Sequence, residues 1–183
     1  MVGLGHLAGD NTGYARDISA DGSVIVGGSG FQAARYAGGT VQGLGYLSGG
    51  SYSEAYAVSG DGSTIVGYNI FGSEDSSYGE AYVWDAVNGM QNLQAVLQAQ
   101  GADLTGWSRL GVANGISADG AKIAGVGTYN GVNQAFLAQL SPAAVPEPSG
   151  LALVAVGLSV GLWRRRTVRT RAGPRLSERG PAS

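Results

Sequence analysis

The sequence predicts an all-β fold built from four-stranded antiparallel repeats, with one short helical insert and a single apolar helix near the carboxyl end. Three observations support the sheets. Glycine accounts for 33 of the 183 residues and only 13% of residues are charged, whereas glycine usually makes up about 7% of a protein. Three related hexapeptides, each containing Asp-Gly, also recur along the chain. Abundant glycine and recurring turn signals are typical of short strands joined by tight turns.

The hexapeptide places an Asp-Gly pair after a β-branched residue, with the aspartates at Asp21, Asp61 and Asp119. Glycine adopts the positive φ that a tight hairpin turn requires. The first two aspartates lie 40 positions apart, and the third lies 58 positions further on. Each turn is followed by an apolar strand that ends in glycine, at residues 24–27, 64–67 and 122–125. Another strand comes next in each repeat, and it begins at Gln32, Glu80 or Gln134.

A fourth strand is predicted in the first two units, after turns at Gly38-Gly39 and Asn88-Gly89. The third unit lacks this strand, whereas residues 2–7 have the sequence of a fourth strand with no unit before it. The third unit is longer because it holds a helical insert at 90–100, in which residues 92–100 form two to three turns that end at Gly101.

Four short strands in about 40 residues are typical of one β-propeller blade. Residues 2–140 are therefore predicted to form a propeller-like domain of about three repeats, which is an incomplete set because known propellers have about four to eight blades. The domain is a fragment, an open stack of blades or half of a dimeric ring, and we favour the fragment.

The repeats resemble the extracellular HAF repeats of exported bacterial proteins, which are named for a His-Ala-Phe tripeptide. The matching tripeptides here are residues 32–34, 80–82 and 134–136. The resemblance covers residues 3–140 and implies an exported protein.

A linker at residues 141–148 follows the repeats and ends in Pro146, Glu147 and Pro148. The two prolines fix φ and remove backbone donors, so we expect this segment to be stiff, extended and accessible to another protein.

An uncharged apolar run at residues 149–163 comes next, and it is predicted to be a transmembrane helix. The 16 residues from Pro148 to Trp163 span about 24 Å as a helix, less than a hydrocarbon core of about 30 Å, so thinning of the bilayer and snorkelling must cover the difference. A buried core helix and a simple tail anchor are the alternatives. Trp163 suits the membrane interface, and the positive-inside rule places the next residues in the cytoplasm: Arg164, Arg165 and Arg166.

These three segments, in this order, resemble the PEP-CTERM sorting signal of Gram-negative bacteria. An exosortase, a membrane protease-transferase, recognises that signal on exported proteins, usually in bacteria that make exopolysaccharide. The resemblance implies that Pro146, Glu147 and Pro148 are the sorting motif, and that the membrane stop consists of Trp163, Arg164, Arg165 and Arg166. This chain continues past the arginines with an Arg-rich tail, residues 164–183, which is predicted to be disordered.

Charge is divided unevenly along the chain. Residues 1–145 contain four Lys or Arg against eleven Asp or Glu, a net charge of −7, and residues 164–183 carry +6. The acidic repeat domain argues against nucleic-acid binding, which needs a basic face. The basic tail follows a membrane segment, so lipid is its expected neighbour. Residues 1–5 contain no export signal, so we expect the chain to be a fragment or to start further upstream.

We find no pattern that predicts catalysis, a cofactor or a metal site. The chain has no Cys and a single histidine, His6, whose counterpart in the second repeat is Tyr46, so this position is expected to serve packing. None of the three Asp-Gly turns has the ligand spacing of a calcium loop. Several tyrosines could stack on sugars, although cross-strand packing is the favoured interpretation: Tyr14, Tyr46, Tyr52, Tyr68, Tyr78 and Tyr129.

The sequence thus predicts a non-enzymatic repeat protein of the cell surface or extracellular matrix. It would be anchored in the inner membrane with a periplasmic ectodomain until an exosortase processes it. The expected partners are the exosortase, inner-membrane lipid and exopolysaccharide. A carbohydrate-binding or polysaccharide-processing β-propeller of the cell envelope is the alternative, and a fragment that is never exported is the third possibility.

Overall fold

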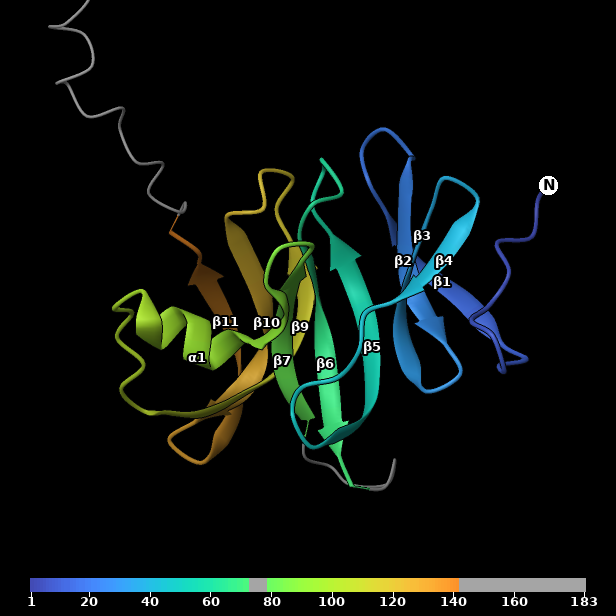
Figure 1. Cartoon of the computed structure of the whole chain (residues 1–183). Coiled ribbons are helices and arrows are strands. Elements are labelled where there is room, and N and C mark those ends of the chain that lie inside the picture. The colour runs from blue at the N-terminus through green and yellow to red at the C-terminus, as the bar shows by residue number, and fades with distance from the viewer. Residues whose placement is uncertain (73–78, 142–183) are drawn as a thin grey trace, which may run out of the picture. The chain divides into compact units, whose positions relative to one another are not determined.

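Each predicted repeat folds into its own antiparallel sheet, with the strands in chain order (Figure 1). Sheet A consists of β1 (Gly13–Ile18), β2 (Val24–Ser29), β3 (Gln32–Ala37) and β4 (Thr40–Gly43). Sheet B consists of β5 (Gly50–Val58), β6 (Ile65–Phe71), β7 (Gly79–Asp85) and β8 (Gly89–Asn92). Sheet C has three strands, which are β9 (Trp107–Ile116), β10 (Lys122–Tyr129) and β11 (Val132–Gln139). The prediction of antiparallel repeats is confirmed, and within residues 1–72 and 79–141 the third unit has no fourth strand, as predicted.

The computed structural model describes residues 1–72 and 79–141. The chain divides into two units, Met1–Ala143 and Ala144–Ser183, and the second lies outside the described residues. Every residue of the predicted sorting motif and membrane stop also lies outside them: Pro146, Glu147, Pro148, Trp163, Arg164, Arg165 and Arg166. Among the residues that are described, no helix is long and apolar enough to cross a membrane.

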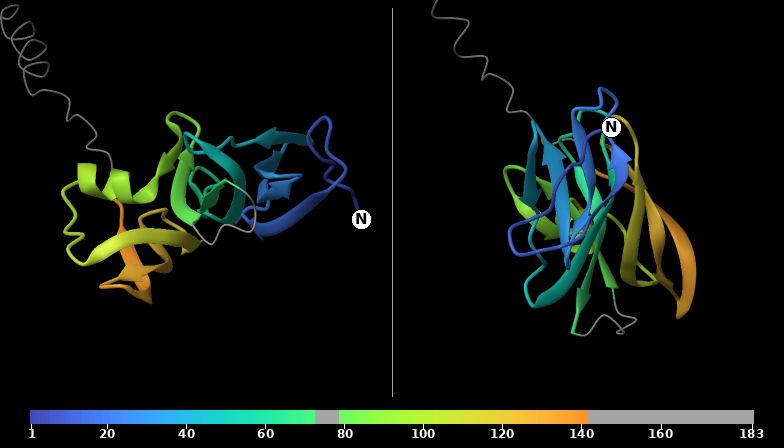
Figure 2. Two further views of the ribbon diagram at one scale, coloured as in Figure 1. Left: turned by 90° about the horizontal axis from the view of Figure 1, so that it is seen from below. Right: turned by 90° about the vertical axis from the view of Figure 1, so that its right-hand side faces the viewer.

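Sheet B lies between sheets A and C (Figures 1 and 2). The first strand of sheet B, β5, contacts both β1 of sheet A and β9 of sheet C. The first strands of the three sheets are therefore neighbours along one side of the stack, which we call the inner side. Side chains from all three repeats can meet there.

Two hydrophobic cores fill the spaces on either side of sheet B. The core between sheets A and B contains Val26, Ile65 and Trp84, and the core between sheets B and C contains Val66 and Ile123. Because β6 supplies both Ile65 and Val66, its alternating side chains reach both cores. The hydroxyl of Tyr82 is buried in the first core, and among the described residues it has no hydrogen-bond partner.

The Asp-Gly turns have one structure in all three repeats. The glycine φ angles are 74°, 73° and 72°, which confirms the predicted positive φ. In sheet B, Ser59 Oγ donates to Asp61 Oδ1 at 2.6 Å and accepts a bond from Thr64 N at 3.0 Å. Backbone bonds of 2.9 Å join neighbouring turns, from Ala20 N to Gly60 O and from Gly60 N to Ala118 O. The turns thus close each hairpin and also connect the sheets.

The helical insert is α1 (Leu93–Ala99), which packs its buried Leu93 and Leu97 into the core between sheets B and C. It begins where the Asn92 side chain accepts a bond from Ala95 N, and the positive φ of Gly101 follows its end. The predicted start at residue 90 is wrong, because Met90 and Gln91 belong to β8 and pair with β7.

Two further boundaries differ from the prediction. Residues 2–7 form no strand; Val2 and Leu4 instead line a hollow with Ile25 and Tyr36 of sheet A. The second strands also do not end at the repeated glycine, since β2, β6 and β10 each continue beyond it.

Candidate functional site on the inner side of the sheets

The first strand of each sheet has a β-bulge at the same position of the repeat. Arg16 is the extra residue of β1, because Ala15 and Asp17 pair with consecutive residues of β2. Tyr56 and Asn114 are the extra residues of β5 and β9 in the same way. A bulge bends its strand and redirects a side chain, and bulges are frequent beside binding sites.

The repeated glycine of the second strand lies opposite each bulge. A Cβ atom at Gly67 would lie only 1.9 Å from the carbonyl oxygen of Glu54 in the neighbouring strand. The equivalent distances at Gly27 and Gly125 are 2.0 and 2.1 Å. Only glycine permits this close approach of the two strands, so the glycine belongs to the bulge and does not end the strand.

The three bulge residues line one hollow of about 480 Å³ together with two valines. We call it the bulge hollow, and its lining residues are Arg16, Tyr56, Val112, Asn114 and Val126. Three repeats therefore direct a guanidinium, a phenol and a carboxamide to the same place.

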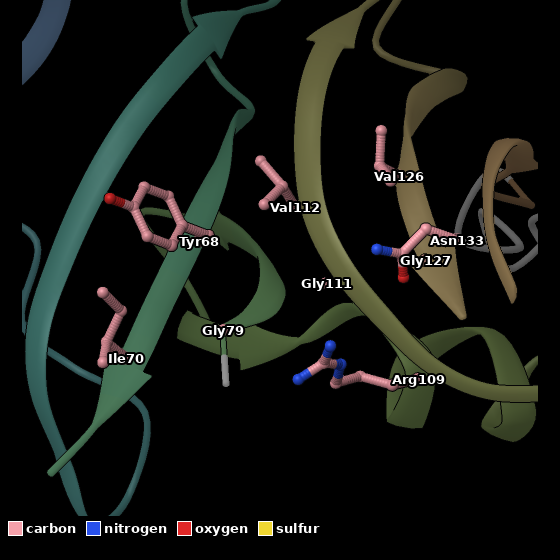
Figure 3. A pocket seen from close by; sticks show the side chains of 9 residues that line it. All are labelled: Tyr68, Ile70, Gly79, Arg109, Gly111, Val112, Val126, Gly127 and Asn133. Carbon is pink, nitrogen blue, oxygen red and sulfur yellow. The ribbon is translucent and has the colours of Figure 1, made fainter. Parts of the chain in front are cut away.

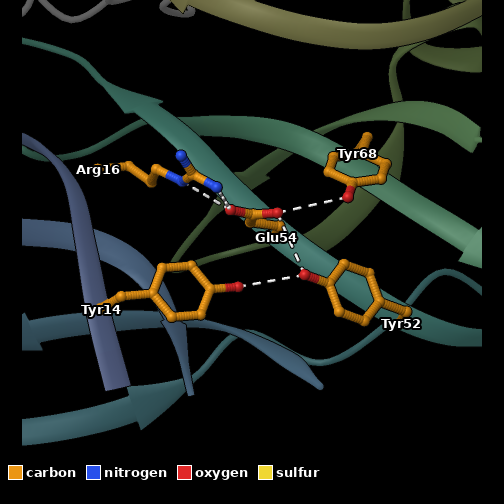
Figure 4. Close-up of polar contacts among 5 residues, drawn as sticks. All are labelled: Tyr14, Arg16, Tyr52, Glu54 and Tyr68. Atoms are coloured by element: carbon orange, nitrogen blue, oxygen red, sulfur yellow. Dashed lines mark hydrogen bonds and ion pairs between the residues drawn. The ribbon is translucent and has the colours of Figure 1, made fainter. Parts of the chain in front are cut away.

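Arg16 is held in position by an ion pair with Glu54 (Figure 4). Arg16 Nη2 lies 2.5 Å from Glu54 Oε1, and Arg16 Nε donates to the same oxygen at 2.6 Å. The Glu54 side chain is only 4% exposed, whereas that of Arg16 is 48% exposed. The pair thus joins a buried carboxylate of sheet B to a half-exposed guanidinium of sheet A.

The second oxygen of Glu54 accepts hydrogen bonds from two tyrosines (Figure 4). Tyr52 and Tyr68 donate to Glu54 Oε2 at 3.2 and 3.3 Å. The hydroxyl of Tyr14 lies 3.2 Å from that of Tyr52, so a proton donated by Tyr14 completes a chain that ends at the carboxylate. These hydrogen bonds and the ion pair stabilise the negative charge of Glu54, which would otherwise be energetically costly to bury.

The aromatic rings of this network pack against one another. The guanidinium carbon of Arg16 lies 5.5 Å from the ring centre of Tyr14 and 5.3 Å from that of Tyr56, within cation–π range. Tyr56 stacks on Tyr68 with ring centres 5.4 Å apart. We call these residues the tyrosine cluster, which comprises Tyr14, Arg16, Tyr52, Glu54, Tyr56 and Tyr68.

Burial raises the pKa of all four tyrosines of the cluster. The nearby Glu54 carboxylate also contributes to the raised pKa of each, because a second negative charge beside it is unfavourable. Hydrogen bonding to Glu54 raises the pKa of Arg16. The phenols therefore stay protonated and the guanidinium stays charged throughout the physiological pH range.

A second cleft, of about 270 Å³, lies between sheets B and C (Figure 3). Tyr68 and Ile70 line it from sheet B, and Arg109 and Asn133 line it from sheet C. It shares Val112 and Val126 with the bulge hollow and Tyr68 with the tyrosine cluster. The three features therefore adjoin one another on the inner side.

The structure brings together some of the residues considered for sugar stacking and separates others. Tyr14, Tyr52 and Tyr68 meet in the tyrosine cluster, whereas Tyr129 packs against Trp107 of sheet C at 5.1 Å. Tyr78 lies outside the described residues.

The position of His6 and Tyr46 does not serve packing as predicted. Both side chains are exposed, because residues 1–7 form no strand and Tyr46 lies beyond the end of β4.

No sequence pattern predicted a functional role for Glu54 or for the three bulge residues. A signal was nevertheless present in the repeats. When the repeats are aligned, the residue before the bulge is alanine each time and the residue three positions after it is serine, whereas the bulge position itself is Arg16, Tyr56 or Asn114. The bulge position thus varies among the repeats, whereas the alanine before it and the serine after it are constant.

The aspartates of the Asp-Gly turns have a structural role, as predicted. Asp21, Asp61 and Asp119 each accept bonds from a serine hydroxyl and a backbone N–H of their own turn. These bonds lower the pKa of each carboxyl, that of Asp21 to about 2. Within residues 1–72 and 79–141, no group of three His, Cys, Asp or Glu side chains could hold a metal ion.

The chain matches no protein-family model and no curated protein sequence. Among solved structures, it is similar to the crystal structure of TolB from Acinetobacter baumannii, with 19% sequence identity and a TM-score of 0.47. The match covers 75% of this chain and 32% of the TolB chain, so this chain spans about a third of that protein's length.

Proposed function

We propose that this chain is an exported, non-enzymatic repeat protein that an exosortase sorts to the cell surface or extracellular matrix. The observation that carries the proposal is the order of three segments near the carboxyl end. Pro146, Glu147 and Pro148 come first, the apolar run at residues 149–163 follows, and the cluster from Arg164 to Arg166 comes last. Each segment has the composition that a membrane-inserted sorting signal requires: prolines that favour an extended backbone, an uncharged apolar run and a cluster of basic residues.

The repeat domain is compatible with this role. We propose that its three sheets are blades of a propeller-like array of the HAF type, and that the apolar run is a transmembrane helix. Each sheet packs its faces against its neighbours and each Asp-Gly turn bonds to the next, as in repeat proteins that are stabilised mainly by nearest-neighbour contacts. Such an array can present a surface outside the cell without any catalytic group.

The experiment is expression of the whole chain behind a cleavable export signal, in exosortase-containing and exosortase-deficient cells of the same strain. We expect a smaller mature protein at the surface or in the medium of the first cells only. Glu147→Ala should leave the precursor unprocessed in the inner membrane, and replacement of the three arginines by Gln should change its processing, because it removes the stop. Arg175→Gln with Arg179→Gln is the control, because it removes positive charge from the tail and leaves the stop unchanged. The same mass and location in both strains would contradict the proposal.

A further inference from the structure

The bulge hollow has the properties of a built binding site. Its three polar residues come from three different strands, and each occupies the one position of its repeat where a bulge redirects the side chain. The hollow is open to solvent and measures about 480 Å³, so a ligand would lie along the surface and not inside an enclosed cavity.

When the repeats are compared, the residues that support the bulge are constant, whereas the bulge residues that line the hollow vary. The glycines opposite the bulges are the same in all three repeats because no side chain fits there. Arg16, Tyr56 and Asn114 instead differ in charge, size and hydrogen-bonding capacity. The packing of the repeats therefore does not fix the residue type at this position. Three different polar groups around one hollow are what the recognition of an asymmetric ligand requires.

The guanidinium of Arg16 is pre-organised for binding. Glu54 holds its Nε and Nη2, and the rings of Tyr14 and Tyr56 flank it at 5.5 and 5.3 Å. Its side chain is nevertheless 48% exposed, so N–H groups remain that can donate to a ligand. A side chain already fixed by its neighbours loses little conformational entropy on binding.

The other lining residues complete a surface that is part polar and part apolar. Asn114 is exposed and offers both a donor and an acceptor. Val126, a residue that is 41% exposed, and Val112 provide an apolar wall. Sugars combine hydroxyl groups, which donate and accept hydrogen bonds, with C–H faces that pack on apolar side chains, so this surface complements a sugar.

The charges favour a neutral ligand over an anionic one. The positive charge of Arg16 is already compensated by Glu54, and residues 1–145 have a net charge of −7. An acidic sugar or a phosphate would find no uncompensated cation at the bulge hollow, and the surrounding field would repel it.

We propose that the bulge hollow binds a short segment of a neutral polysaccharide, with Arg16, Asn114 and Tyr56 bonding its hydroxyl groups. This inference goes beyond the proposed function and does not depend on the sorting signal. Binding can be present in a protein that no exosortase processes, and processing can occur without binding.

The test is calorimetric titration of the full chain, purified in a polyoxyethylene ether detergent, which has no sugar headgroup to compete. The probes are neutral gluco-, galacto-, manno- and xylo-oligosaccharides of four to six units, and uronic-acid oligosaccharides of the same length. We expect at least one neutral series to bind and the uronic acids not to bind. Asn114→Ala should weaken that binding about tenfold, which corresponds to the loss of one or two hydrogen bonds.

Two further variants make the result specific to the hollow. Tyr56→Phe removes only a hydroxyl and should weaken binding about threefold to tenfold. Gln42→Ala, on exposed β4, is the matched control and should leave affinity unchanged. An unchanged thermal unfolding midpoint in each variant would show that the fold is intact. The proposal is overturned if no neutral oligosaccharide binds, if uronic acids bind more tightly, or if Asn114→Ala binds as well as the parent protein.

Discussion

Arg16 of β1 and Glu54 of β5 lie 38 positions apart in the chain and form an ion pair of 2.5 Å across the junction of sheets A and B. The two partners differ in burial, since Glu54 is 4% exposed and Arg16 is 48% exposed. Their removal should therefore have unequal effects.

Replacement of Arg16 should destabilise the protein more than replacement of Glu54. Arg16→Met leaves a buried carboxylate with only tyrosine donors, and we expect a loss of roughly 2–3 kcal/mol in the free energy of unfolding. Glu54→Gln leaves a guanidinium that can turn to solvent, and should cost about 1 kcal/mol. Denaturant unfolding of both single variants and the double variant measures these values. A double variant less stable than Arg16→Met would contradict this account, because no buried charge then remains.

Gly67→Ala should be severely destabilising, by roughly 3 kcal/mol or more, because the new Cβ atom would lie 1.9 Å from the carbonyl oxygen of Glu54. Gly115→Ala is the control, since no atom lies within 4 Å of a Cβ atom at that position. Both unfolding free energies can be measured in the same denaturant series. Equal stability of the two variants would show that the strands at the bulge are further apart.

Tyr82→Phe should be neutral or stabilising by up to about 1 kcal/mol, because it removes a buried hydroxyl that has no partner among the described residues. Tyr36→Phe is a matched comparison. The Tyr36 hydroxyl is also buried but donates to Gly28 O at 2.8 Å, so its removal should cost about 1 kcal/mol. If Tyr82→Phe cost as much as Tyr36→Phe, the Tyr82 hydroxyl would have to be hydrogen-bonded.

Asp61→Ala should lower stability by about 1 kcal/mol at neutral pH, since the carboxylate accepts bonds from Ser59 and Ser63. These bonds lower the pKa of Asp61. The stabilisation is therefore present above the unfolded pKa of about 3.9 and is lost as the pH falls through the lower, folded pKa. Unfolding at a series of pH values should show the parent and variant converging below about pH 4. A constant difference down to the lowest pH would rule out an ionic contribution.

Alkaline pH should act on the tyrosine cluster. The folded pKa values of Tyr14, Tyr52, Tyr56 and Tyr68 are raised by burial. Their contribution to stability is therefore complete below the unfolded pKa of about 10 and decreases as the pH rises above it. We expect cooperative unfolding at high pH, with tyrosinate absorbance appearing at the same time. In Tyr56→Phe, the free energy of unfolding should decrease less steeply as the pH rises. Titration of all the tyrosines in a protein that stays folded would contradict the buried cluster.

Much of the fold could be predicted because the repeats carry their own turn chemistry. The aspartates of the three Asp-Gly turns located every hairpin between the first and second strands, and the glycines before β4 and β8 located two more. Local sequence patterns gave the wrong secondary structure at residues 2–7, which form no strand, and at Met90, which belongs to a strand and not to the helix. At both places the outcome depends on which neighbour the segment meets, and that is a tertiary property.

The candidate site was less accessible to prediction from the sequence. Arg16 and Glu54 belong to different repeats, and only the packing of sheet A on sheet B makes them a pair. The bulges at Tyr56 and Asn114 arise from a register shift between strands, which alternation of apolar and polar residues does not reveal. Comparison among the repeats would have shown the variable position, although not where its side chain points.

The backbone bonds from Ala20 to Gly60 and from Gly60 to Ala118 use the same position of each repeat as donor and as acceptor. A duplicated or deleted unit would bring an identical donor and acceptor to the new junction. The gain or loss of a unit would therefore need no new linking residue, and each added unit would contribute one more bulge side chain to the inner side.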